Sequence, residues 1–115
     1  MSDWTRKAVL ALTCVVPPAL GPAELHADGD PQAGREKAKQ CESCHGTDGR
    51  SVEPSYPNLA GQYESYLIKA LSDYRSGARD HAIMKSFAAN LSNQDIEDLA
   101  AWHSSQEGLK DLSIK

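Results

Sequence analysis

The chain lacks the long apolar run that a membrane-spanning helix requires. Its most apolar stretch, residues 8–16, is far shorter than the about 20 residues needed to cross a bilayer. Basic side chains are not in excess either, since 12 Lys and Arg stand against 16 Asp and Glu, for a formal net charge of −4. Nucleic-acid binding needs a basic patch, and none is visible. We therefore expect no membrane span and no nucleic-acid partner.

Cysteine is scarce, and one of the three cysteines lies in a segment with the layout of an export signal. Arg6 and Lys7 precede the apolar run, and the sequence Leu25-His26-Ala27 follows it. This order of basic, apolar and small residues is typical of a cleaved secretory signal. We predict that residues 1–27 are a signal peptide, with cleavage after Ala27 favoured and the exit at Gly21-Pro22-Ala23 as the alternative. Residues 28–115 would then form a single domain in the periplasm.

Cys14 lies inside the apolar run of this signal. A lipoprotein signal would place a small residue before the modified cysteine and a longer apolar stretch ahead of it. Thr13 and the shortness of the run argue against such an anchor, so we expect the exported protein to be soluble. The exported domain then contains two cysteines, Cys41 and Cys44.

No segment shows the sustained alternation of apolar and polar residues that marks a strand, and apolar residues recur instead at helical spacing. Asp30-Pro31 gives an N-cap followed by proline at the first helical position, and Ser92 with Asp95 resembles a capping box. Gly77 is a helix stop signal. We expect an all-α fold with helices over residues 31–40, 62–76, 85–89 and 92–106.

Helical spacing also assigns faces to two of these helices. On the second helix, the inward face is expected to carry Tyr63, Tyr66, Leu67, Ala70, Leu71 and Tyr74. The inner side of the last helix is expected to carry Ile96, Leu99, Ala100, Trp102 and His103. Its acidic residues Asp95, Glu97 and Asp98 are expected to form a solvated face, with a docking surface for a basic partner as the alternative.

The most informative motif is Cys41-Glu42-Ser43-Cys44-His45. In this pattern each thiol can form a thioether with one vinyl group of a haem, and the following histidine can donate an imidazole nitrogen to the iron. A thioredoxin-like pair would need a βαβ context, and a zinc site would need two more ligands at suitable spacing. Neither is visible, so the motif predicts one covalently bound haem c. A buried haem would also supply apolar surface to a small domain.

Three side chains are candidates for the sixth coordination position of the iron. Met84 is the methionine that remains once residues 1–27 are removed, and a His/Met pair raises the potential of a haem iron. His81 lies three residues away and competes for the same region. His103 lies on the last helix, where we expect solvent exposure or packing between helices.

Over residues 30–107 the chain resembles the class I c-type cytochromes, the small bacterial periplasmic type with a single haem. The matching stretches are residues 41–46, Pro57-Asn58-Leu59-Ala60-Gly61-Gln62, the helix and turn over 66–79, and residues 84–102. The resemblance implies the cytochrome c fold, with three to four short helices wrapped around one covalently bound haem. It also implies that Cys41 and Cys44 hold the haem and that His45 and Met84 are the axial ligands of its iron.

The same resemblance assigns roles to residues outside the motif. The carbonyl group of Pro57 would accept the second ring proton of His45, which fixes the orientation of the imidazole. Gly34 and Trp102 match the positions where the first and last helices cross. Arg79 matches a recurring arginine, for which solvent exposure and contact with a haem carboxylate both remain open.

These features predict a protein that carries single electrons between redox partner proteins. No catalytic acid–base pair can be nominated and both axial positions would be filled, so we do not expect an enzyme. The expected partners are a donor dehydrogenase or cytochrome complex and an acceptor oxidase or reductase. A haem subunit of a larger oxidoreductase is the alternative, followed by a haem sensor or catalyst with a labile distal ligand. The sequence does not specify the oligomeric state.

Overall fold

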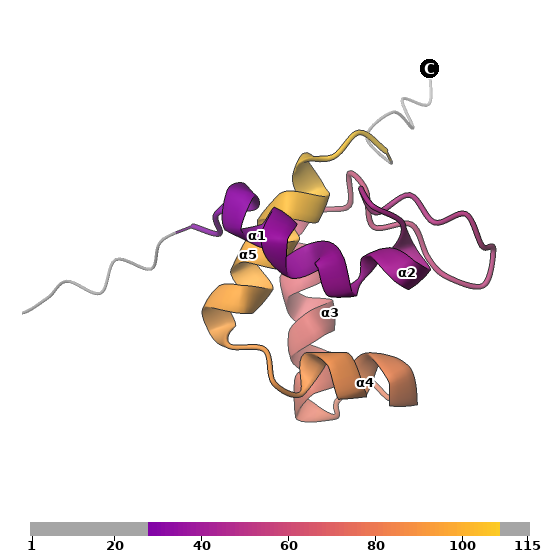
Figure 1. Cartoon of the computed structure of the whole chain (residues 1–115). Coiled ribbons are helices and arrows are strands. Elements are labelled where there is room, and N and C mark those ends of the chain that lie inside the picture. The colour runs from indigo at the N-terminus through magenta and orange to yellow at the C-terminus, as the bar shows by residue number, and fades with distance from the viewer. Residues whose placement is uncertain (1–27, 109–115) are drawn as a thin grey trace, which may run out of the picture.

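The computed structural model describes residues 28–108, which fold into short helices joined by loops (Figure 1). These are α1 (Pro31–Lys37), the 3-10 turn η1 (Ala38–Gln40), α2 (Glu42–His45), α3 (Glu64–Ser76), α4 (Ala82–Ala88) and α5 (Asn93–Ser105). Residues 28–108 contain no strand, so the predicted all-α class is confirmed. None of their helices is long and apolar enough to cross a membrane. The predicted signal peptide, residues 1–27, lies outside the described residues.

The first predicted helix, over residues 31–40, consists of α1 followed by the tighter turn η1. The Asp30 carboxylate accepts a hydrogen bond from the Gln32 amide at 2.8 Å, so it caps α1 as expected. Helix α2 follows at once and delivers His45. The sequence pattern did not predict α2, because a helix of four residues carries no periodicity.

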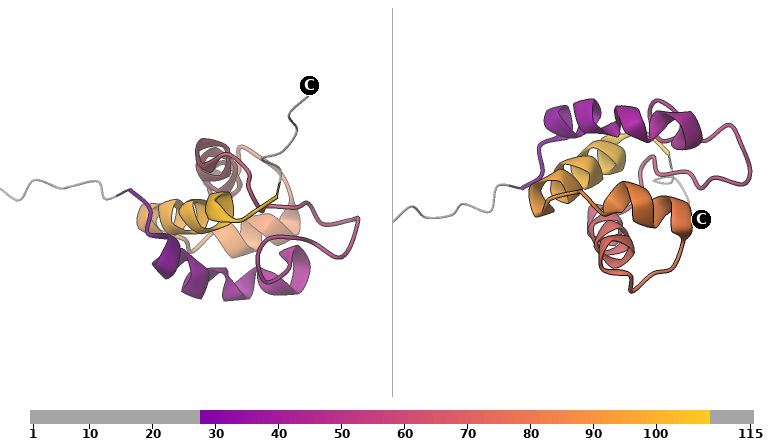
Figure 2. Two further views of the ribbon diagram at one scale, coloured as in Figure 1. Left: turned by 90° about the horizontal axis from the view of Figure 1, so that it is seen from above. Right: turned by 60° about the horizontal axis from the view of Figure 1, so that its bottom comes forward.

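Helix α5 packs between α1 and α3 (Figure 2). Gly34 of α1 makes the crossing with α5 possible, because a β-carbon at this position would lie 1.9 Å from the Asp98 carbonyl oxygen. The same β-carbon would lie 2.8 Å from the Cβ atom of Trp102. The close helix approach predicted at Gly34 is therefore confirmed.

An ion-pair cluster ties the carboxyl end of α1 to α5. The Lys37 ammonium lies 2.8 Å from Asp95 Oδ1 and 2.5 Å from Asp98 Oδ2. Asp98 also accepts hydrogen bonds from the Asp30 amide and the Gln94 side chain, both at 2.8 Å, and is only 3% exposed. The prediction of a fully solvated acidic face on this helix is therefore wrong at Asp98. This carboxylate is buried because Lys37 and two N–H donors compensate its charge.

Helix α3 begins at Glu64, two residues later than predicted. Tyr63 lies at its N-cap and is 81% exposed, so its predicted place on the inward face is wrong. Leu67 is buried as expected, and Gly77 ends the helix with a positive φ of 84°. The inward face of α3 therefore begins after Tyr63.

The remaining helices also follow the sequence signals, with shifted ends. Helix α4 begins at Ala82, three residues earlier than expected, and α5 carries the predicted capping box of Ser92 and Asp95. The core of the described chain is small. Its buried apolar residues are Ala38, Ala60, Leu67, Ala88, Ile96, Leu99, Ala100 and Ala101. Most of these are alanines, so the helices enclose space that their own side chains do not fill.

Candidate functional site

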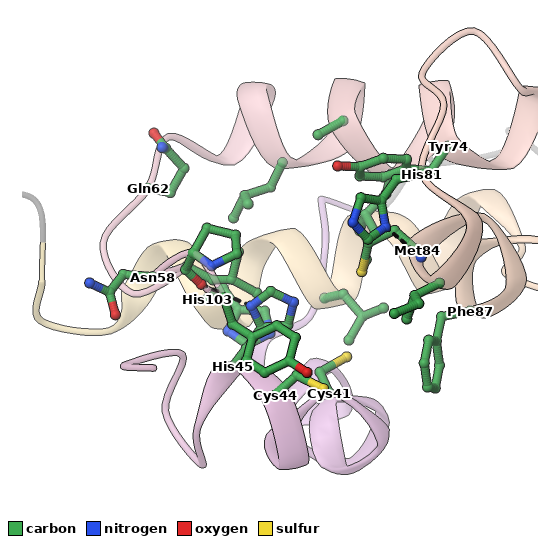
Figure 3. Close-up of a pocket in the computed structure, with 18 of the residues that line it drawn as sticks. Cys41, Cys44, His45, Asn58, Gln62, Tyr74, His81, Met84, Phe87 and His103 are labelled. Atoms are coloured by element: carbon green, nitrogen blue, oxygen red, sulfur yellow. Dashed lines mark hydrogen bonds between the residues drawn. The ribbon is translucent and has the colours of Figure 1, made fainter. Parts of the chain in front are cut away.

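A cavity of about 450 Å³ lies between the helices and the loop that precedes α3. Its apolar and aromatic lining includes Tyr56, Leu59, Tyr66, Leu67, Ala70, Leu71, Tyr74, Ile83, Phe87, Leu99 and Ala100. Cys41, Cys44, His45, Met84, His81 and His103 also line it, and Figure 3 shows them converging on one space. The structure therefore brings together every side chain that the sequence nominated as a haem or iron ligand. Pro57 lies in the same wall.

Two free thiols occupy one side of the cavity, next to α2 (Figure 3). Cys41 is the N-cap residue of α2 and Cys44 lies within it, three positions on, so both side chains project from the same side of this turn. Both side chains are half-buried. Burial raises the pKa of Cys41 to about 11, with smaller contributions from Cys44 and Glu42. The bare chain therefore keeps Cys41 as a neutral thiol.

His45 is the buried end of α2 and is only 6% exposed. Its Nδ1 atom lies 2.8 Å from the carbonyl oxygen of Pro57, twelve residues along the chain. Since a carbonyl can only accept, Nδ1 carries the proton and donates it. The ring of Tyr56 contacts the imidazole edge-on, with centroids 6.4 Å apart. The hydrogen bond to Pro57 fixes the tautomer of His45, so its Nε2 atom is the nitrogen that keeps a free lone pair for a metal.

The opposite side of the cavity is formed by the start of α4. Met84 is half-buried in the first turn of this helix, and Figure 3 shows its side chain entering the cavity beside the ring of His81. The Met84 amide lies 3.4 Å from His81 Nδ1, which caps the helix. Two of the three candidates for the sixth position, Met84 and His81, are thus placed at one site. His81 has a second role there that the sequence reasoning did not foresee.

His103 of α5 is only 4% exposed and lines the cavity, so its predicted place on the inner side of the last helix is confirmed and the alternative of solvent exposure is not observed. Neither ring nitrogen has a hydrogen-bond partner among the described residues. Burial is the main cause that lowers the pKa of His103 to about 4, and the charge on His45 lowers it further. The helical spacing predicts this placement, since His103 lies four positions after Leu99 on the inward face of α5.

Arg79 is the permanently charged side chain among the described residues that line the cavity. Its guanidinium lies 4.7 Å from the centre of the Tyr74 ring and donates to the hydroxyl group of Tyr66 at 3.4 Å. It is exposed, so solvent contact is observed. The two tyrosines hold the charged group at the rim of the cavity.

The residues of this cavity fit a covalently bound haem. The pair of thiols at the spacing of the motif suits thioether formation with two vinyl groups. A histidine nitrogen and a methionine thioether sulfur are the axial donors that c-type haem iron takes in proteins. The apolar walls suit a porphyrin, which would fill the space that the small core leaves open.

Comparison with known families and proteins supports this assignment. The family described as Cytochrome c matches residues 31–106. A cytochrome c4 from Pseudomonas aeruginosa is 48% identical over 82 residues, which cover 71% of this chain and 41% of that protein. Cytochrome c-554(548) from Halomonas halodenitrificans is 48% identical over 82 residues, covering 69% of this chain and 99% of that protein.

Two relatives carry a more specific description, that of a thiosulfate dehydrogenase electron acceptor, and one of them is from Stutzerimonas stutzeri. The Stutzerimonas stutzeri protein is 42% identical over 65 residues, which cover 56% of this chain and 30% of that protein. Among solved structures, reduced recombinant cytochrome c4 from Pseudomonas stutzeri matches with a TM-score of 0.67 at 44% identity. That match covers 70% of this chain and 47% of the other. The chain therefore spans at most about half the length of the cytochrome c4 proteins it matches.

Proposed function

Because this chain belongs to the cytochrome c family, we propose that it carries one electron at a time between redox proteins. It binds haem c covalently, as the family does. One observation supports the proposal above the others. A single apolar cavity is lined by the two thiols of the motif, by the His45 imidazole and by Met84 (Figure 3).

In this proposal Cys41 and Cys44 hold the haem through thioethers, and His45 and Met84 are the axial ligands of its iron. When bound, the haem supplies a one-electron couple between ferric and ferrous iron. His45 offers Nε2 because Pro57 occupies its Nδ1 proton. The thioether of Met84 favours the reduced state and so raises the potential.

The chain's own contribution is to hold these donors in place and to limit access of water. His45 is buried and hydrogen-bonded, so its orientation does not change when the charge on the iron changes. The apolar walls lower the local dielectric, which also affects the potential. With both axial positions filled, no open site remains for substrate, and we propose that the protein is not an enzyme.

Two further parts of the proposal concern where the protein acts and with what. Export to the periplasm as a soluble protein follows from the signal-like layout of residues 1–27 and the requirements of haem attachment. The redox partners would be a dehydrogenase or cytochrome complex on one side and an oxidase or reductase on the other. The likeness to a thiosulfate dehydrogenase electron acceptor favours one second candidate function, a haem subunit bound to such an enzyme.

A redox titration of the loaded protein tests the carrier function. We expect a single one-electron transition and no binding of carbon monoxide to the ferrous protein at neutral pH. Rapid binding of carbon monoxide would contradict the proposal, because it requires an open or labile sixth position. Size-exclusion chromatography of the protein from its native source separates the two candidates. A free carrier elutes alone, whereas a subunit elutes with its enzyme throughout the purification.

A further inference from the structure

We propose that His81 is a positioning residue for Met84: its imidazole caps α4 by accepting the backbone N–H of Met84 and so holds the thioether toward the haem cavity. The inference rests on the proposed function in one respect, namely that Met84 is an axial ligand. It removes His81 from the set of competing ligands and gives it a different task. Two contacts of His81 and the shortness of α4 support this role.

The first contact is the cap itself. His81 has extended backbone angles, with φ −164° and ψ 108°, and α4 begins at the next residue. Its Nδ1 atom accepts from the amide of Met84, the third helical residue, at 3.4 Å. A side chain at this position usually satisfies one of the unpaired N–H groups of the first turn. Here the donor is the amide of the candidate ligand, so the cap orients the residue that carries the sulfur.

The second contact holds the ring of His81 from the side of α3. Tyr74 meets this ring edge-on, with centroids 6.3 Å apart and planes at 70°. Tyr74 is in turn covered by the Arg79 guanidinium at 4.7 Å, which also donates to the Tyr66 hydroxyl at 3.4 Å. The ring of His81 is therefore packed against a tyrosine of α3 that is itself covered by Arg79. Figure 3 shows Tyr74, His81 and Met84 grouped at this end of the cavity.

The third consideration is the shortness of α4, which has only seven residues. A helix of this length is unstable by itself, and one cap is a large share of its local stability. As an acceptor, Nδ1 carries no proton, so the proton of the neutral ring lies on Nε2. A ring that rotated away to bind iron would leave the Met84 amide without its cap.

Three variants of the loaded ferric protein test the role of His81. The readouts are the long-wavelength absorption band of methionine-ligated ferric haem and the rate at which cyanide replaces the sixth ligand. His81→Ala removes the cap, and we expect cyanide to enter about fivefold faster, the factor that corresponds to a typical cap of ~1 kcal/mol. His81→Asn keeps a strong N-cap but offers no imidazole, and we expect a rate close to that of the unchanged protein. Lys85→Gln, in the next turn, is the control and leaves both readouts unchanged.

The outcomes separate positioning from ligation and from a purely structural effect. Rescue by His81→Asn supports the cap, because general loss of packing would not be restored by a smaller side chain. If His81→Asn is as fast as His81→Ala, or if His81→Ala is no faster than the unchanged protein, the proposal is overturned. If His81→Ala fails to load haem, the His81→Asn variant decides alone. If His81 were the iron ligand, His81→Asn would lack the normal absorption spectrum of the loaded protein.

Met84→Ala makes failure of the proposed function distinguishable from failure of this inference. Loss of the long-wavelength band in Met84→Ala, together with an unchanged rate in His81→Ala, rejects the positioning role and keeps the ligand. Retention of the band in Met84→Ala rejects Met84 as the ligand, and with it the premise on which the positioning role rests.

Discussion

The Nδ1 atom of His45 lies 2.8 Å from the carbonyl oxygen of Pro57 and joins α2 to the loop before α3. This bond sets the tautomer of the only histidine in the motif and leaves Nε2 free for iron. Pro57 contributes only its backbone carbonyl group to this bond. The proline side chain can therefore affect the bond only through the conformation of the loop.

Replacement Pro57→Ala keeps the carbonyl group and therefore the bond to His45. We expect the free energy of unfolding to fall by only about 0.4–1 kcal/mol, because the unfolded chain gains freedom. The measurement is a urea unfolding curve of the loaded protein, together with the proton resonance of the His45 ring N–H. Persistence of that resonance is expected. Its loss would show that the proline ring, and not the carbonyl, orients the histidine.

Gly34→Ala is predicted to be strongly destabilising. A β-carbon there would lie 1.9 Å from the Asp98 carbonyl oxygen, so α1 and α5 must move apart. Overpacking of this kind costs about 1–3 kcal/mol or more. Chemical denaturation of the loaded protein gives the cost, with Gln32→Ala on the exposed side of α1 as the control. A cost equal to that of the control would contradict the close crossing.

Gly34 also shows what the sequence could predict and why. A glycine inside a helix is unfavourable, so its presence indicates a close contact, and the contact exists. The caps at Asp30 and Ser92 were predictable in the same way, because each is a local signal. Helix α2 was not, since its four residues are fixed by tertiary contacts such as the bond from His45 to Pro57.

Asp98→Ala should cost more than the loss of any exposed ion pair in the chain. The buried Asp98 carboxylate binds Lys37, the Asp30 amide and Gln94, so its removal leaves these donors short of a partner. We expect a loss of about 2–3 kcal/mol in the free energy of unfolding. The matched control is Glu36→Gln, whose pair with Lys39 is 61–65% exposed and should contribute little. Equal effects in the two variants would contradict the account of the cluster.

Because His103 is buried, we expect the free energy of unfolding to fall in mild acid. Burial, then the charge on His45, lowers the pKa of His103 from 6.5 to about 4 in the folded chain. Between pH 4 and pH 6.5 the unfolded state binds more protons at this histidine than the folded state does. The contribution of the neutral, buried His103 to the free energy of unfolding is therefore complete above pH 6.5 and is lost as pH falls toward 4. The loss amounts to about 3 kcal/mol. Unfolding curves at several pH values measure it.

His103→Phe is the matched variant for this pH dependence. It keeps an aromatic ring in the cavity wall and removes the titrating group, so the slope between pH 6.5 and 4 should largely disappear. An unchanged slope would assign the acid sensitivity to other groups.

One error of the sequence interpretation has a clear physical cause. Asp98 is a charged residue on α5, and its charge alone suggested exposure. Asp98 is buried because Lys37 lies opposite it on α1. Such partners belong to other segments of the fold, and no local pattern reveals them. The convergence of Cys41, His45 and Met84 was predictable, because the motif and the resemblance specify that site directly.

The most direct test of the account is the methyl resonance of Met84 in the reduced, loaded protein. The sequence has two methionines, and Met1 is lost if residues 1–27 are removed, so methyl-labelled methionine would give one signal in the exported domain. If Met84 binds the iron, its methyl group lies above the porphyrin, and the ring current shifts this resonance far outside the ordinary methionine range. A single resonance at an ordinary methionine position would contradict Met84 as the sixth ligand.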